Sequence, residues 1–195
     1  MTGEDHNLWR SCHAAAADKT VDRDLRAIYR RLDADVQKRG PTCWVSGRCC
    51  NFDQYGHLLY VTALEIAWVI RRVGDGQRSG SKRPTSIECG QPDSPANPSV
   101  GLPVVGQTDE VRGPCRYQVN GLCSIHAIRP MGCRVYFCQS GTQQWQQQLY
   151  EQYLTRLRKL HERHSVPYLY MEWRAGLDEA RRSIRADRSV ASDAR

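Results

Sequence analysis

The chain has 195 residues, of which 40% are hydrophobic and 25% charged, and its formal net charge is +7. This length suits one domain of ordinary size, and this composition excludes a fully disordered chain. The most apolar run, residues 58–70, is interrupted by polar residues and is too short to cross a bilayer, so no membrane association is predicted. The first residues lack the basic start and apolar centre of a secretory signal, so we expect a cytoplasmic protein.

The outstanding feature of the composition is its nine cysteines. Thiols rarely persist as structural disulfides in a reducing cytosol, so a cysteine-rich chain of this kind indicates metal ligation or thiol chemistry. The odd count also argues against a complete disulfide framework. All but two of the cysteines lie in two segments, 43–50 and 115–138. Cys12 and Cys89 lie outside both segments, and we expect neither to be a ligand.

The first predicted elements are helices. Apolar residues at helical spacing predict an amphipathic helix over 22–39. Thr62 and Glu65 have the spacing of a capping box, which opens a second helix over 62–73. Gly74 is expected to stop that helix.

The second half of the chain begins with a segment of different character. Residues 74–110 are rich in Gly, Pro and Ser, which predicts a flexible insertion. The Asn120-Gly121 pair predicts a tight β-hairpin over 116–125. Amphipathic patterns then predict helices over 142–163 and 168–185. The expected fold is therefore mainly α: a single small helical domain over 1–195, packed around a cysteine-ligated metal site and carrying one short hairpin.

The two cysteine segments carry a resemblance to a known family. The first runs Cys43-Trp-Val-Ser-Gly-Arg-Cys-Cys50, and the second contains an Asn-Gly hairpin, an Arg-Pro pair and a closing Cys-Arg-Val-Tyr-Phe-Cys138. This ordered set resembles the YkgJ-like cysteine-cluster family, whose members are described as zinc- or iron-chelating proteins. The resemblance covers about a third of the chain. It implies a metal site formed by the family's cysteines, here Cys43, Cys49, Cys50, Cys115, Cys123, Cys133 and Cys138.

This sequence departs from the family pattern at two positions. Ser46 stands where the family has a cysteine, and a serine hydroxyl is a poor ligand for zinc or iron at neutral pH. His126 stands where the family has tyrosine, and it is either a packing residue or a supplementary ligand. A regular hairpin would also place Cys115 and Cys123 on opposite faces, so a shared ion would require a bend there.

Ligand type alone does not separate zinc from a 4Fe–4S cluster, because both accept four thiolates. The cysteine spacings lack the paired knuckles of zinc fingers and also differ from common ferredoxin spacings. A related domain in flagellin lysine methylases resembles an iron–sulfur-binding part, which slightly favours iron–sulfur. Arg116, Arg129 and Arg134 lie in a stretch without acids and would compensate the negative charge of a tetrathiolate site.

The resulting functional hypothesis is a cytosolic metal-binding protein with a structural, redox, sensing or delivery role. The alternatives are an iron–sulfur enzyme that modifies a protein or other macromolecule, as a methylase would, or a zinc-stabilised interaction module. No nucleotide- or SAM-binding motif is found, which favours the metal-binding hypothesis over the enzyme while leaving enzymatic activity open. A protein partner is compatible with the sequence, whereas interleaved acids disfavour nucleic acid. His161 and His164 are predicted to lie on a solvated helix face.

Overall fold

The computed structural model describes residues 3–41, 47–78 and 113–193, and within these ranges the fold is mainly α-helical, as predicted. Cys43, Ser46, Cys89 and most of the predicted insertion lie outside the described residues. The long helices are α1 (Gly3–Ala17), α2 (Lys19–Arg39), α4 (Ala63–Arg78), α6 (Gln143–Arg163) and α7 (Trp173–Asp193). The short elements are η1 (Arg48–Cys50), α3 (Phe52–Tyr55), β1 (Tyr60–Thr62), β2 (Gln118–Val119), β3 (Leu122–Cys123), η2 (His126–Ile128), α5 (Met131–Val135) and β4 (Tyr170–Glu172).

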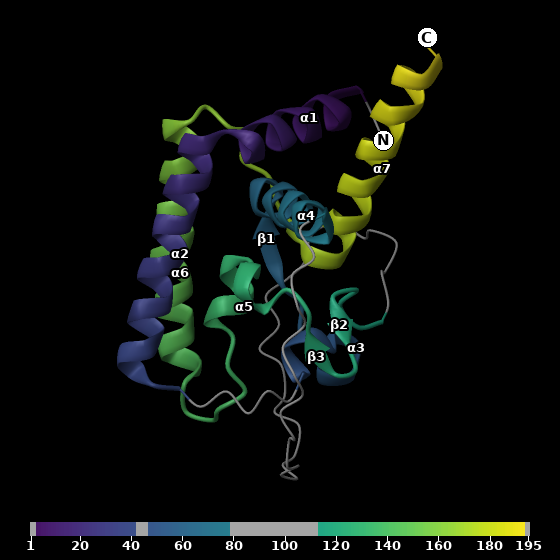
Figure 1. Cartoon of the computed structure of the whole chain (residues 1–195). Coiled ribbons are helices and arrows are strands. Elements are labelled where there is room, and N and C mark those ends of the chain that lie inside the picture. The colour runs from purple at the N-terminus through teal and green to yellow at the C-terminus, as the bar shows by residue number, and fades with distance from the viewer. Residues whose placement is uncertain (1–2, 42–46, 79–112, 194–195) are drawn as a thin grey trace.

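Helix α2 confirms the helix predicted over 22–39 and has both of its ends capped. The Asp18 side chain accepts hydrogen bonds from the backbone N–H groups of Thr20 (2.7 Å) and Val21 (3.2 Å). Gly40 ends the helix in the left-handed conformation, with φ of 64°. The apolar stripe faces α6, which runs antiparallel beside α2 (Figure 1).

Helix α4 lies at the centre of the fold, between α1 and the start of α7 (Figure 1). Its predicted capping box is present, because the Glu65 carboxylate accepts from Thr62 N (3.0 Å) and Glu65 N donates to Thr62 Oγ1 (3.3 Å). The prediction that Gly74 stops the helix is wrong, since α4 continues to Arg78. Glycine ends a helix by adopting the left-handed conformation, and Gly74 does not adopt it.

The predicted helix over 168–185 begins later than expected. Residues 170–172 form β4, which pairs antiparallel with β1 so that Val61 faces Met171, and α7 starts at Trp173. The pairing fixes this segment in an extended form that local periodicity does not predict. Helix α1 was not predicted, because its buried residues Trp9, Cys12 and Ala16 form too thin an apolar stripe.

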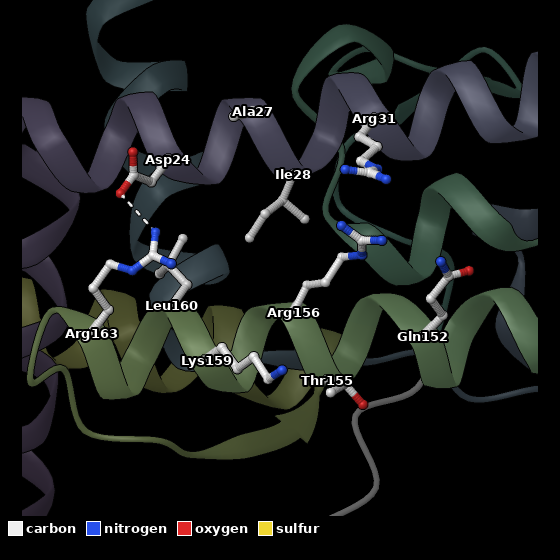
Figure 2. A pocket seen from close by; sticks show the side chains of 10 residues that line it. All are labelled: Asp24, Ala27, Ile28, Arg31, Gln152, Thr155, Arg156, Lys159, Leu160 and Arg163. Atoms are coloured by element: carbon white, nitrogen blue, oxygen red, sulfur yellow. Dashed lines mark ion pairs between the residues drawn. The ribbon is translucent and has the colours of Figure 1, made fainter.

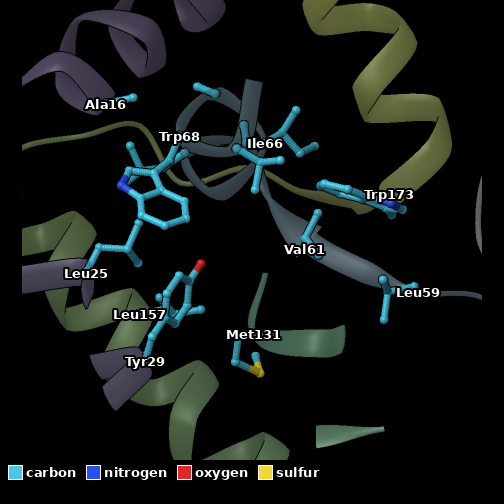
Figure 3. Close-up of a cluster of buried hydrophobic side chains, with 14 of the residues drawn as sticks. Ala16, Leu25, Tyr29, Leu59, Val61, Ile66, Trp68, Met131, Leu157 and Trp173 are labelled. Carbon is cyan, nitrogen blue, oxygen red and sulfur yellow. The ribbon is translucent and has the colours of Figure 1, made fainter. Parts of the chain in front are cut away.

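The hydrophobic core surrounds α4 and is drawn in part in Figure 3. A buried polar group lies within it. The Glu65 carboxylate is fully buried and also accepts from the Tyr29 hydroxyl on α2 and from the backbone N–H of Met131 on α5, each at 2.8 Å. One carboxylate thereby joins three helices. The two cysteine segments also contribute to this core, since Cys50, Tyr117 and Met131 are buried.

Candidate metal centre

The two cysteine segments meet through backbone contacts that place the hairpin against residues 47–50. The N–H of Cys115 donates to the carbonyl of Cys50 at 2.7 Å, and the Gln118 amide donates to the carbonyl of Gly47 at 2.9 Å. Gly47 has a φ of +69°, and a Cβ at this position would lie 2.0 Å from the Gly121 carbonyl oxygen. Only glycine fits this contact.

The hairpin itself confirms the Asn-Gly prediction. Asn120 and Gly121 have positive φ values of 53° and 76°, and the two strands pair with Gln118 opposite Cys123. The ladder is short, however, and Cys115 lies outside it in a turn closed by a bond from Gln118 N to Cys115 O (2.8 Å). This turn supplies the bend that a regular hairpin lacks, so Cys115 and Cys123 both approach Cys50.

Five of the predicted ligands gather in this region. The Sγ atoms of Cys49 and Cys50 are 4.0 Å apart, and the Cys50 thiol also interacts with those of Cys115 and Cys123. Cys133, on α5, lies close enough for the charges of Cys115, Cys123 and Cys49 to affect its titration. The site therefore draws on η1, the hairpin and α5; a long stretch of sequence separates η1 from the hairpin, whereas α5 follows the hairpin closely.

The thiols strongly perturb one another's ionisation. The pKa of Cys115 is lowered to about 6 and that of Cys49 to about 7, in both cases chiefly because the Cys50 thiol hydrogen-bonds to them. The same contact lowers the pKa of Cys123, while donation to Cys115, Cys123 and Cys49 raises the pKa of Cys50. Burial and the neighbouring thiolates raise the pKa of Cys133. Cys49, Cys115 and Cys123 thus favour the thiolate form beside Cys50, and a cation would compensate their negative charge.

The arginines of the second segment play different roles. The positive charge of Arg129 favours the thiolate of Cys49, and that of Arg116 favours the thiolate of Cys115, as the charge-compensation argument predicts. Arg134 is instead a buried structural residue. Its guanidinium donates to both carboxylate oxygens of Asp33 (3.0 and 2.7 Å) and to two backbone carbonyls in the loop before α5, and it lies 4.4 Å from the Tyr29 ring centre.

Helix α7 supports the site through its first two residues, which the sequence pattern did not single out. The buried indole N–H of Trp173 donates to Cys115 Sγ at 3.3 Å. Arg174 donates to Asp53 Oδ1 and to the Gly113 carbonyl, each at 2.8 Å, and so holds the start of the second segment against α3. Sequence spacing gives no signal for these contacts, because Trp173 fits equally well as an ordinary core residue.

Cys138, Cys12 and two histidines near the cysteine segments occupy varied positions. Cys138 is partly buried in the segment between α5 and α6, where it interacts with neighbouring groups. His126 is exposed, and its Nε2 contacts the Arg129 guanidinium. His57 stacks on Tyr136, with ring centres 4.6 Å apart. Cys12 lies in the core on α1, and burial raises its pKa to about 12, as suits a residue outside the site.

The prediction of a solvated face for the two histidines of α6 is wrong. His161 is buried, and its Nδ1 faces the carbonyl of Pro167 at 3.0 Å. The half-buried His164 places Nε2 3.0 Å from Asp24 Oδ2 on α2. Both side chains are covered because α6 packs against α2 and against the chain segment that leads to β4. The hydrophobic periodicity of α6 itself cannot reveal these two packing partners.

Within residues 3–41, 47–78 and 113–193, no three His, Cys, Asp or Glu side chains have the arrangement of a preformed metal site. The donor chemistry nevertheless fits a thiophilic metal, because several low-pKa thiols converge beside cationic groups. No family model, curated protein or solved structure matches the chain. No helix of the described residues combines the length and apolar character needed to span a membrane.

Proposed function

We propose that this protein binds a metal through the five gathered thiols, holding either zinc or an iron–sulfur cluster in a structural, redox, sensing or delivery role. The observation that carries the proposal is the mutual interaction of Cys49, Cys50, Cys115 and Cys123 beside Cys133. The lowered pKa values of Cys49, Cys115 and Cys123 favour their thiolate forms, and burying several thiolates close together is costly unless a cation compensates their charge. A bound metal would supply that compensation.

One distance favours zinc. With Zn–S bonds of about 2.3 Å, two thiolates of a tetrahedral site lie roughly 3.8 Å apart. The Cys49 and Cys50 sulfurs are 4.0 Å apart, close to that edge length. In a 4Fe–4S cluster each cysteine binds a different iron, which requires a wider separation. This separation is compatible with Cys49 and Cys50 as two ligands of one zinc ion, with the further ligands drawn from Cys115, Cys123 and Cys133.

When bound, zinc would supply structural cross-linking and an iron–sulfur cluster would supply electron transfer. The chain's own residues define the environment of either group. Trp173 donates to one ligand sulfur, and Arg129 and Arg116 reduce the negative charge of the site. These roles concern binding and electrostatics, and no substrate is implied by them.

Metal analysis of anaerobically purified protein tests the proposal. We expect about one metal site per chain, with zinc giving a colourless protein and iron with sulfide giving absorption near ~400 nm. Less than about 0.2 equivalents of either metal after reconstitution would contradict metal binding.

Serine variants then identify the ligands. Cys50→Ser, Cys115→Ser and Cys123→Ser should each lose most of the metal, and Cys133→Ser should lower its occupancy and the melting temperature. Cys12→Ser is the matched control, because Cys12 is equally buried but lies in the helical core. If Cys50→Ser and Cys115→Ser both retain all of their metal, these cysteines are not ligands and the proposed site is wrong.

A further inference from the structure

A second feature of the molecule lies far from the thiols, in the groove between α2 and α6. The groove has a volume of about 740 Å³, and Figure 2 shows the side chains that line it. Its floor is apolar, formed by the half-buried Ile28, the buried Leu160 and Ala27. We call this feature, with its lining residues, the α2/α6 groove.

The rims of the α2/α6 groove are cationic. Arg31 on α2 and Arg156 on α6 point toward each other across it, and Lys159 and Arg163 continue the row along α6 (Figure 2). Two guanidinium groups that face each other repel, so their arrangement favours an anionic group between them.

The described carboxylates neutralise these rims only in part. Within the described ranges, Asp24 alone forms an ion pair with a groove cation, with Oδ2 3.6 Å from Arg163 Nη1. The same carboxylate is already shared with Arg23 (3.0 Å) and His164 (3.0 Å).

Among the described residues no carboxylate oxygen forms an ion pair with Arg31, Arg156 or Lys159. The pKa of the nearby Asp35 is lowered, chiefly by its hydrogen bond from Tyr153 and also by the charge of Arg31. The Arg156 guanidinium lies 5.0 Å from the centre of the Tyr153 ring, which carries no charge to compensate it.

The shape of the α2/α6 groove and its apolar floor indicate which kind of polyanion would fit it. A row of cations on either side of an apolar floor matches a helix that has an apolar stripe flanked by acids, and two packed helices present the kind of groove into which a third helix packs. A nucleic acid strand would bind through its phosphates and would gain little from contact with an apolar floor of this kind. In addition, no aromatic side chain lines the α2/α6 groove on which a base could stack.

We propose that the α2/α6 groove docks an acidic amphipathic helix of a partner protein. The apolar stripe of that helix would cover the exposed Ala27 and the half-buried Ile28, and its acidic flanks would pair with Arg31, Arg156 and Lys159. This inference is independent of metal binding, because the groove shares no residue with the thiol site.

The test uses the full-length protein and a designed probe: a fluorescent helical peptide with leucines at i, i+4 and i+7 and glutamates on both flanks. Fluorescence anisotropy should show saturable binding that weakens as salt increases. Arg31→Glu/Arg156→Glu should weaken this binding at least ~tenfold, because like charges would then face each other. The same double variant should bind a matched peptide in which lysine replaces each glutamate.

The control variant, Arg182→Glu/Arg185→Glu, makes the same charge change on exposed positions of α7 and should bind like the wild type. If the groove double variant fails to fold, the single change Lys159→Glu at an exposed position takes its place, with weaker binding expected.

Three outcomes would overturn the proposal. The first is equal binding of a scrambled peptide with the same charge but no apolar stripe. The second is tighter binding of an oligonucleotide that depends on Arg31 and Arg156. The third is a homodimer, seen in sedimentation, that the groove double variant dissociates, since the groove would then be occupied by a second copy.

Discussion

Trp173 lies outside the cysteine segments but affects the ionisation of a cysteine in the candidate site. Its indole N–H, donated to Cys115 Sγ at 3.3 Å, stabilises the thiolate and contributes to the lowered pKa of that cysteine. The ring is fully buried against Tyr117, so the donor is held in place by packing. Hydrogen bonds of this kind orient and tune metal ligands.

Replacing Trp173 with phenylalanine removes the donor while keeping an aromatic ring. In metal-free protein the pKa of Cys115 should then rise by roughly half a unit to one unit, because the thiolate loses a hydrogen bond. The measurement is the pH dependence of Cys115 alkylation, followed by mass spectrometry. Cys123 lacks this contact and is coupled to Cys115 only through Cys50 and through charge, so its pKa should shift less. An equal shift at both cysteines would point to a general structural change instead.

Arg134 shows a second residue-scale effect. Its planar guanidinium donates hydrogen bonds to both carboxylate oxygens of Asp33 and, at the same time, to two backbone carbonyls. A lysine side chain cannot reproduce this geometry. Arg134→Lys should lower the free energy of unfolding by about 2–4 kcal/mol, since a buried cation would lose several of its partners. Urea denaturation measures this. Arg116→Lys, at a half-exposed ion pair with Asp178, should change stability by less than ~0.5 kcal/mol.

At the scale of elements, the hairpin docks on the first cysteine segment through the contact at Gly47. Gly47→Ala should separate the hairpin from residues 47–50, because the added methyl group would meet the Gly121 carbonyl in a backbone conformation that alanine disfavours. We expect loss of bound metal and of hydrogen-exchange protection at Cys115 N–H.

Gly141 supplies the matched control for that change. It also has a positive φ, +77°, but no atom lies within 4 Å of a Cβ built there. Gly141→Ala should therefore carry the backbone strain of about 1 kcal/mol and keep the metal. Equal metal loss in the two variants would show that strain, and not the hairpin contact, governs the site.

For the whole molecule, buried histidines couple stability to pH. Burial lowers the pKa values of His13, His57 and His161 below the ordinary value of 6.5. Because the unfolded chain binds these protons more readily, stability is greatest above pH ~6.5 and falls as pH decreases toward the folded pKa values. The slope is at most about 1.4 kcal/mol per pH unit for each histidine.

Urea denaturation between pH 7.5 and pH 5 checks this expectation. Replacing His161 with glutamine removes one buried titrating group and should flatten the decline. The exposed His126 is less suitable for this purpose because Arg129 also contributes to its lowered pKa. Stability that is constant over this pH range in the wild type would contradict the coupling.

Local sequence patterns were enough to predict the features that depend on residues adjacent in the chain. Helical spacing placed α2 and α6, the capping box placed the start of α4, and Asn120-Gly121 placed the hairpin turn. These signals are local, since a cap, a turn or an amphipathic face is encoded within a few residues. The cysteine count and its concentration in two segments indicated metal ligation, and the family resemblance implied which cysteines would be ligands.

Contacts between residues that are far apart in the chain could be seen only in the tertiary structure. The pairing of β4 with β1, the burial of Glu65 among three helices and the contact of Trp173 with Cys115 all join residues far apart in the chain. The bend at Cys115 and the clamp formed by Arg134 likewise depend on neighbouring elements. Such contacts are selected by packing and by the need to satisfy buried polar groups, and neither requirement leaves a periodic signal in the sequence.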